Sequence, residues 1–260
     1  QMIEVHNLTF GYSATEDGQI LKGVDFAAKT GKLTALIGTN GAGKSTLLKT
    51  IMGILKGKGE ISVNGKPVSQ YSTKDFSSTV SYLSQDNDCK VNLSVFEVVM
   101  LGRMGSMSFR VSDEDIAATQ EVLERLNLQR FASRSIMELS GGQRQLVFMA
   151  QALVKEPKIL ILDEPTSALD LHKQFDLLTL LKNLTQENDF TTLVTLHHLD
   201  LAAMFADEII VLKEGRVYAQ GAPKDIFTEA MMEDVYRVKT KIYMDDNGLP
   251  HVIPLEAIIN

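Results

Sequence analysis

One short loop constrains the fold of this chain more than any other part of its sequence. Residues Gly38–Ser45 match the pattern G-x-x-x-x-G-K-[ST] at every fixed position. The loop follows the apolar run Leu33–Ile37 and precedes a predicted helix at Lys44–Met52. Glycines let successive backbone N–H groups turn inward, and the start of the helix adds its positive dipole end. The pattern therefore predicts a phosphate-binding loop between a buried strand and a helix.

The residue types in this loop indicate how it would hold ATP together with Mg²⁺. Lys44 supplies a mobile ammonium for the β- and γ-phosphates, and Ser45 offers a hydroxyl to Mg²⁺. The motif alone leaves small GTPases, kinases, helicases, motors and transport ATPases open. The residues expected to contact ATP here are Gly38, Thr39, Asn40, Gly41, Ala42, Gly43, Lys44, Ser45 and Thr46.

A second apolar strand ends in two carboxylates. The run Ile159–Leu162 is followed directly by Asp163 and Glu164. Because successive residues of a strand face opposite sides, the two carboxylates need not do the same work. Asp163 can hold Mg²⁺, usually through a water molecule, and Glu164 can polarise the attacking water as a general base. The alternative is a solvated acidic strand end, which the presence of the phosphate-binding loop disfavours.

The pattern of apolar residues predicts an α/β fold. Residues 3–10 and 20–28 alternate apolar and polar side chains, which predicts antiparallel strands joined by a polar turn near Glu16–Gly18. Asn64-Gly65, directly after Glu60–Val63, signals another hairpin. In the last third of the chain, strands and helices alternate, which predicts a mostly parallel sheet covered on both faces. The elements expected there are strands at Ile159–Leu162, Thr192–Thr195 and Ile209–Leu212, and helices at Leu171–Gln186 and Leu199–Phe205.

The segment from about residue 87 to 157 differs from the rest and predicts a helical lobe. It has helical spacing and few β-branched runs, and Ser112 followed by Asp115 resembles a capping box. A further helix is expected from about Gly142 to Val154. We therefore expect one domain over residues 1–260, with a sheet core and an antiparallel β subdomain (1–86 and 158–260) that carry this lobe.

Composition excludes several classes of protein. The formal net charge is −7 with no dense Lys/Arg stripe, which argues against nucleic acid as a partner. Cys89 is the single cysteine, so an internal disulfide is impossible and a cysteine metal site is disfavoured. The N-terminal residues lack the pattern of a secretory signal. Since no stretch approaches the roughly 18 apolar residues that span a bilayer, any membrane role requires a partner.

The decisive segment is Leu139–Gln143, which reads Leu-Ser-Gly-Gly-Gln and opens a helix after the predicted lobe. It makes a second anion-binding helix start, although a single domain has no need for two γ-phosphate cradles. Here the sequence resembles the ATP-binding-cassette (ABC) family, whose signature is LSGGQ. The resemblance implies the P-loop ABC-ATPase fold and a second copy of the chain whose signature completes the ATP site. The residues it implies as contacts to the other copy's ATP are Ser140, Gly141, Gly142, Gln143 and Asp170.

Other positions match the family one by one. Tyr12 resembles the aromatic residue that stacks on adenine, with a core or surface tyrosine as the alternative. Gln85 resembles the glutamine that ligands Mg²⁺, beside Ser45 and Asp163, and senses the membrane partner. His197 resembles the switch histidine at the γ-phosphate, so the expected catalytic residues are Lys44, Glu164 and His197. His198 follows where the family commonly has Asp, a departure that leaves His197 in register.

Two further segments resemble ATPase subunits of importers for iron–siderophore, haem and cobalamin. They are Leu101–Arg103 and the tail from Val235 to Pro254, and the alternative is that both only cap the fold. The resemblance also implies a groove near Gln85–Arg110 that receives a short helix of a membrane permease. Three methionines in that stretch, namely Met100, Met104 and Met107, suit such a surface, and they suit core packing equally well.

Taken together, the resemblance implies an ATPase that acts as a homodimer at the cytoplasmic face of a membrane, bound peripherally to permease subunits. An extracytoplasmic substrate-binding protein would be an indirect partner, and iron–siderophore uptake is the expected transport. Haem, cobalamin or another metal chelate are alternative cargoes. One rival is a cassette ATPase that acts on ribosomes or DNA, which usually has two cassettes or long coiled-coil insertions. Another is a non-catalytic regulatory cassette, against which intact Lys44, Glu164 and His197 speak.

Overall fold

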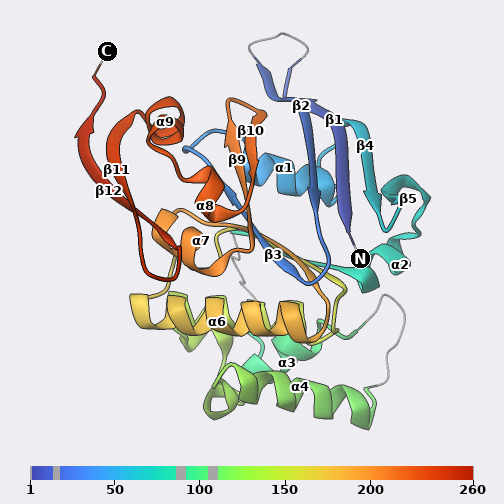
Figure 1. The fold of residues 1–260 in the computed structure, drawn as a ribbon. Helices are drawn as coiled ribbons and strands as arrows, with labels where there is room; N and C mark the ends of the chain where they lie inside the picture. The colour runs from blue at the N-terminus through green and yellow to red at the C-terminus, as the bar shows by residue number, and fades with distance from the viewer. Residues whose placement is uncertain (1, 14–17, 86–91, 105–110, 260) are drawn as a thin grey trace. The chain divides into compact units, whose positions relative to one another are not determined.

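A computed structural model describes residues 2–13, 18–85, 92–104 and 111–259 (Figure 1). The chain divides into two compact units, the first made of Gln1–Gln70 and Leu181–Asn260 and the second of Tyr71–Leu180. The lobe expected at about 87–157 falls within the second unit, and its expected boundaries stay a prediction. Four earlier expectations lie wholly or partly outside the described residues: the turn at Glu16–Gly18, Cys89, Met107 and the groove near Gln85–Arg110.

The first unit contains an antiparallel sheet with the order β2-β1-β4-β5. Residues that alternate burial form β1 (Ile3–Gly11) and β2 (Gln19–Ala28), which pair as predicted. Strand β4 (Lys58–Val63) pairs with the other side of β1 and turns into β5 (Lys66–Pro67) through Asn64 and Gly65. Both turn residues have positive φ angles, of 54° and 72°, which explains why Asn-Gly favours this hairpin.

The first unit also holds four strands in the order β10-β9-β3-β8. At their centre, β3 (Lys32–Ile37) runs parallel to β8 (Thr191–Thr195) and β9 (Glu208–Lys213). Strand β10 (Arg216–Gly221) pairs antiparallel with β9. Leu33, Leu36 and Ile37 of β3 are fully buried, as expected of a parallel strand. The predicted parallel core is confirmed, and β3 leads directly into the phosphate-binding loop and α1 (Lys44–Ile51).

The C-terminal part of the first unit ends in a hairpin that sequence patterns did not predict. Short helices α7 (Leu199–Phe205), α8 (Pro223–Ile226) and α9 (Glu229–Met231) precede the π-helix η5 (Met232–Tyr236). Strands β11 (Val238–Met244) and β12 (Pro250–Ala257) then pair antiparallel.

The second unit combines two parallel strands with helices. Helix α2 (Thr73–Thr79) leads into β6 (Val80–Leu83), which pairs with β7 (Ile159–Leu162). Helices α3 (Val95–Met100) and α4 (Asp113–Arg125) both pack on α5 (Gly141–Leu153). Ser94, Ser112 and Ser140 each close a capping box at the start of these three helices, as predicted for Ser112. Between them lie the short turns η3 (Gln129–Phe131) and η4 (Ile136–Glu138).

Helix α6 (Leu171–Glu187) begins in the second unit and ends in the first. Its last turns are anchored in the first unit by Thr185, whose hydroxyl shares a hydrogen bond of 2.7 Å with that of Thr192 in β8. The short turn η2 (Val68–Gln70) closes the first unit's N-terminal segment. Within the described part of the chain, no helix combines the length and the apolar character needed to cross a bilayer.

Candidate functional site

The phosphate-binding loop in the first unit has the backbone that its glycines make possible. Gly38, Gly41 and Gly43 have φ angles of 148°, 80° and 102°. A Cβ at Gly38 would lie 2.2 Å from the carbonyl oxygen of Leu212 at the end of β9. At Gly41 a Cβ would meet no atom within 4 Å, so there the positive φ alone favours glycine.

The start of α1 is left available for an anion. Gly43 caps the helix without a side-chain hydrogen bond, and no acidic residue lies in the first turn. The first backbone N–H groups of a helix have no partner within it, and the helix dipole favours negative charge there. The buried Lys44 curls back over the loop, where its Nζ donates to the carbonyl oxygens of Gly38 at 2.8 Å and Thr39 at 3.0 Å. A positive charge and the N-terminal end of a helix dipole therefore meet at one point, which suits a phosphate group.

In the second unit, the carboxyl ends of β6 and β7 bring a glutamine and two carboxylates together. Leu83 lies opposite Leu162, so the chain leaves both strands at the same edge. Beyond that edge, the Nε2 of Gln85 donates to the Oε2 of Glu164 at 2.7 Å. Asp163 and Glu164 are both buried, with 1% and 9% of their surface exposed.

Glu164 has an uncommon backbone conformation. Its φ of 50° lies in the left-handed region, where a glutamate is rarely found. The hydroxyl of Ser167 donates to the carbonyl oxygen of Glu164 at 3.0 Å and helps to hold this turn. Such strain is often found where a side chain is aimed for function. Here it aims a carboxylate, which can accept a proton, at the amide of Gln85.

The Leu-Ser-Gly-Gly-Gln segment forms the start of α5. The hydroxyl of Ser140 accepts the Gln143 N–H at 3.3 Å, and the Gln143 Oε1 accepts the Ser140 N–H at 3.0 Å. Gly141 is exposed, and a Cβ there would meet no atom within 4 Å. A Cβ at Gly142 would instead lie 2.9 Å from the carbonyl oxygen of Ala168. The two glycines therefore differ, since Gly141 keeps the helix start open and Gly142 allows the Ser167–Asp170 loop to approach it.

Three other predicted residues have distinct surroundings. Asp170 accepts the Lys173 backbone N–H at 3.0 Å and faces its Nζ at 3.1 Å, and the first of these bonds does most to lower the pKa of Asp170. Tyr12 is 71% exposed and meets Phe10 edge-on, with ring centroids 5.0 Å apart. An exposed tyrosine ring held in place in this way can stack on a base. His197 lies exposed beyond β8, and His198 caps α7.

The two units thus hold different members of the predicted site. Within the second unit, the structure brings Gln85 to Glu164 and the signature segment to the loop before Asp170. The first unit carries the phosphate-binding loop, Tyr12 and His197. No group of three or more His, Cys, Asp or Glu side chains that could hold a metal ion occurs among the described residues. Ser45, Gln85 and Asp163 each carry a side-chain oxygen, the donor type that Mg²⁺ prefers, so their chemistry suits the predicted ligand set.

Comparisons with known proteins agree with this set of motifs. The family model described as ABC transporter matches residues 21–167. The chain belongs to the ABC transporter family. It is therefore an ATP-binding protein and an ATPase of that family.

Relatives of this ABC ATPase match along nearly the whole chain. An uncharacterised ABC transporter ATP-binding protein of Methanocaldococcus jannaschii is 37% identical over 98% of both chains. The iron(3+)-hydroxamate import ATP-binding protein of Bacillus subtilis is 37% identical, over 94% of this chain and 90% of its own. The ferric enterobactin transport ATP-binding protein of Escherichia coli is 35% identical, over 95% and 92%.

Solved structures support the ABC cassette fold. A chain from a transporter assigned to the metal-chelate type, in an inward-facing conformation, has a TM-score of 0.82 and 29% identity. It covers 98% of this chain, which covers 97% of it. A dimeric bacterial ABC transporter cassette has a TM-score of 0.76 and 30% identity, over 85% of this chain and 98% of its own. The predicted fold class is confirmed.

One contact to the phosphate-binding loop was missed by sequence reasoning. The backbone N–H of Gly38 donates a hydrogen bond to the phenol oxygen of Tyr236, and this contact lowers the pKa of Tyr236. Burial of the ring has the larger effect and raises the pKa of Tyr236. In this ABC ATPase the π-helix η5 thus presents its last side chain to the first glycine of the loop. The only sequence signal was the likeness of the tail beginning at Val235 to importer ATPases.

Proposed function

We propose that this ABC ATPase is the nucleotide-binding subunit of an importer, and that two copies close on two ATP molecules to drive a membrane permease. The observation that carries the proposal is that one chain has two separate helix starts, at α1 and at α5, with no acidic residue in the first turn of either helix. A phosphate bound on α1 of one copy would face Ser140 and Gly141 of the other. The dimeric bacterial cassette, at 30% identity, supports such a pair.

The residues of the site have separate tasks in this proposal. Lys44 and the loop hold the phosphates, Tyr12 stacks on adenine and His197 contacts the γ-phosphate. Glu164 accepts a proton from the attacking water, and Gln85 orients the carboxylate through the 2.7 Å hydrogen bond. Mg²⁺, held through Ser45, Gln85 and Asp163, would neutralise charge on the phosphates. Positioning and charge stabilisation then supply most of the catalysis.

The proposed cargo is an iron–siderophore complex. Support comes from the relatives named for hydroxamate and enterobactin transport, at 37% and 35% identity. A permease helix would dock near Gln85–Arg110, of which the structure describes residues 85 and 92–104. In that stretch Met100 is half-buried and Met104 is exposed. The subunit would then sit peripherally at the cytoplasmic face of the membrane, with the substrate-binding protein on the other side.

Two measurements on the purified chain test the enzymatic part. The ATPase rate should rise more steeply than linearly with dilute enzyme, because a pair forms the site. Glu164→Gln should still bind ATP, lose turnover and accumulate as an ATP-bound dimer. A linear rate with no dimer in ATP would overturn the pair, and a wild-type rate for Glu164→Gln would overturn Glu164 as the base.

A separate measurement tests the cargo. Cells that lack this subunit should lose uptake of ⁵⁵Fe carried by a hydroxamate or catecholate siderophore, and wild-type protein, but not Glu164→Gln, should restore it. Uptake of labelled haem or cobalamin that depends on the subunit, with siderophore uptake unchanged, would transfer the proposal to those chelates. Salt-dependent binding to nucleic acid with no effect on any uptake would favour a cassette that acts outside transport.

A further inference from the structure

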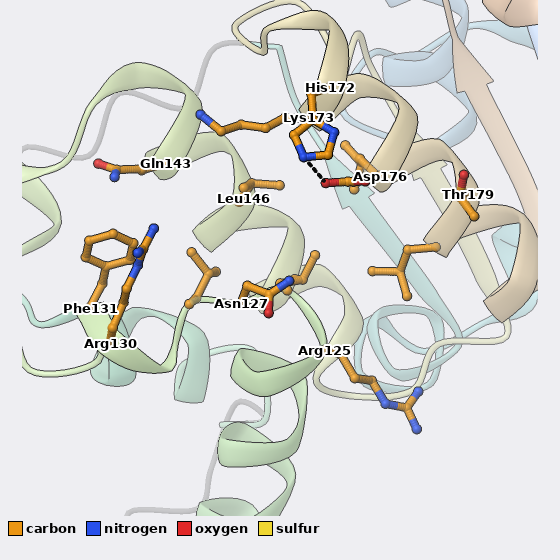
Figure 2. Close-up of a pocket in the computed structure, with 14 residues that line it drawn as sticks. Arg125, Asn127, Arg130, Phe131, Gln143, Leu146, His172, Lys173, Asp176 and Thr179 are labelled. Carbon is orange, nitrogen blue, oxygen red and sulfur yellow. Dashed lines mark ion pairs between the residues drawn. The ribbon is translucent and has the colours of Figure 1, made fainter.

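The second unit contains a cavity to which the proposed function assigns no ligand, although one of its lining residues, Gln143, belongs to the signature segment. It has a volume of about 480 Å³ and is lined by residues from the C-terminal end of α4, η3, α5 and the first turns of α6 (Figure 2). All of its lining residues belong to the unit Tyr71–Leu180. This volume falls within the range of about 300–1,000 Å³ that is usual for small-molecule sites.

The walls of this cavity combine an apolar surface with a few cations. Its apolar lining consists of Leu126, Leu128, Phe131, Leu146, Leu177 and Leu180. The permanent charges are three cations, on Arg125, Arg130 and Lys173, and one carboxylate, on Asp176. In a chain with a formal net charge of −7, a cavity with excess positive charge selects for anions.

Arg130 differs from the other charged residues of the lining. Arg125 is paired with Glu121 at 2.7 Å, Lys173 with Asp170 at 3.1 Å, and Asp176 faces His172 at 3.5 Å. Arg130 makes no ion pair with any residue that the structure describes.

Phe131 holds this arginine in place. The Cζ of Arg130 lies 4.7 Å from the centre of the Phe131 ring, and in Figure 2 the two side chains stand together at one end of the cavity. A guanidinium stacked on a buried ring keeps its N–H donors available at little cost in conformational freedom. Gln143 and Lys173 are drawn at the same end, so donors gather there beside an apolar wall.

We propose that this cavity binds a small amphipathic anion, whose carboxylate, sulfonate or phosphate group pairs with Arg130 while its apolar body lies on the leucines. The ligand class follows from the two parts of the lining, since an unpaired guanidinium favours a planar or tetrahedral oxyanion. The apolar wall favours a body the size of one or two rings or a short acyl chain.

The test uses the full chain without nucleotide and 8-anilinonaphthalene-1-sulfonate as the probe, titrated by fluorescence and by calorimetry. Wild-type protein should bind one probe molecule saturably, with an affinity that falls as salt is added. Arg130→Gln should weaken the affinity about tenfold, the usual loss for one charge-assisted hydrogen bond. Asp176→Asn should strengthen the affinity instead, because it removes the one carboxylate in the lining of this cavity.

Arg134→Gln is the matched control. Arg134 also lies over Phe131, with its Cζ 5.3 Å from the ring centre, but it does not line the cavity. This variant loses the same charge and the same ring contact, so its affinity for the probe should stay within about twofold of wild type. Equal weakening by Arg130→Gln and Arg134→Gln, or weaker binding by Asp176→Asn, would overturn the proposal. Circular dichroism of each variant confirms that its fold is intact.

Discussion

Two glycines of the phosphate-binding loop depend on glycine for different reasons, which makes them separable by mutation. Gly38→Ala places a methyl group against the Leu212 carbonyl as well as adopting an unfavourable φ. The methyl group of Gly41→Ala meets no neighbour, so the only loss of stability comes from the positive φ of 80°. We expect Gly38→Ala to lower the free energy of unfolding by about 3 kcal/mol and Gly41→Ala by about 1 kcal/mol. Denaturant titration measures both values, and equal losses would contradict the steric explanation.

The Tyr236 hydroxyl offers a second test at the residue scale. Tyr236→Phe keeps the ring and removes the acceptor of the Gly38 N–H. Because a loop held less firmly binds phosphate less well, the KM for ATP should rise about fivefold, the equivalent of one neutral hydrogen bond, with kcat nearly unchanged. The control is Tyr218→Phe, which removes a hydroxyl that donates to Asp234 at 2.7 Å on the surface of the same unit. An equal KM for both variants would assign Tyr236 a purely structural role.

At the scale of elements, the ion pair at the start of α4 predicts a pH dependence. Asp115 accepts a 2.7 Å hydrogen bond from Arg103 and closes the capping box with Ser112, and these contacts lower its pKa to about 2. Because the folded-state pKa lies below the ordinary value of 3.8, Asp115 stabilises the fold above pH 4, and this contribution is lost as the pH falls towards 2.

The free energies of unfolding of wild type and Asp115→Asn should therefore differ at pH 6 and converge near pH 2. Denaturant titrations at both values measure the difference. Asp113→Asn, in the same first helical turn, controls for the loss of a negative charge near the helix N-terminus. A gap between wild type and Asp115→Asn that persists at pH 2 would show that the carboxylate acts through packing.

The elements differ in how far the sequence could predict them. The loop at Gly38–Ser45 and the cap at Ser112 depend on local patterns, so both were predictable. The Gln85–Glu164 hydrogen bond joins residues 79 positions apart and needed the parallel pairing of β6 with β7. The link from Tyr236 to Gly38 was not predictable, because it depends on a π-helix. Arg237 caps this helix with a φ of 59°, at a position where a glycine would have signalled the turn.

At the scale of the whole molecule, the proposed pairing predicts that two inactive variants restore each other. Lys44→Ala damages the loop, whereas Gly141→Asp places a negative charge at the open start of α5, where the added Cβ meets no atom within 4 Å. Either variant alone should lose ATPase activity. In an equal mixture, half of the pairs are mixed, and each mixed pair has one site with an intact loop and an intact signature. The mixture should therefore recover about a quarter of the wild-type rate if the two sites act independently.

Matched mixtures show whether this recovery comes from shared sites. Lys44→Ala mixed with Glu164→Gln should stay inactive, because both residues act on the ATP held by their own copy and every site then lacks one of them. Lys44→Ala mixed with an Asp170→Ala variant should recover activity if Asp170, exposed at the start of α6, contacts the other copy's ATP. Each mixture is measured at the concentration where the wild-type rate depends on pairing. Recovery of activity in the mixture of Lys44→Ala with Glu164→Gln would show that a single chain forms the whole site. So would a lack of recovery in the mixture of Lys44→Ala with Gly141→Asp.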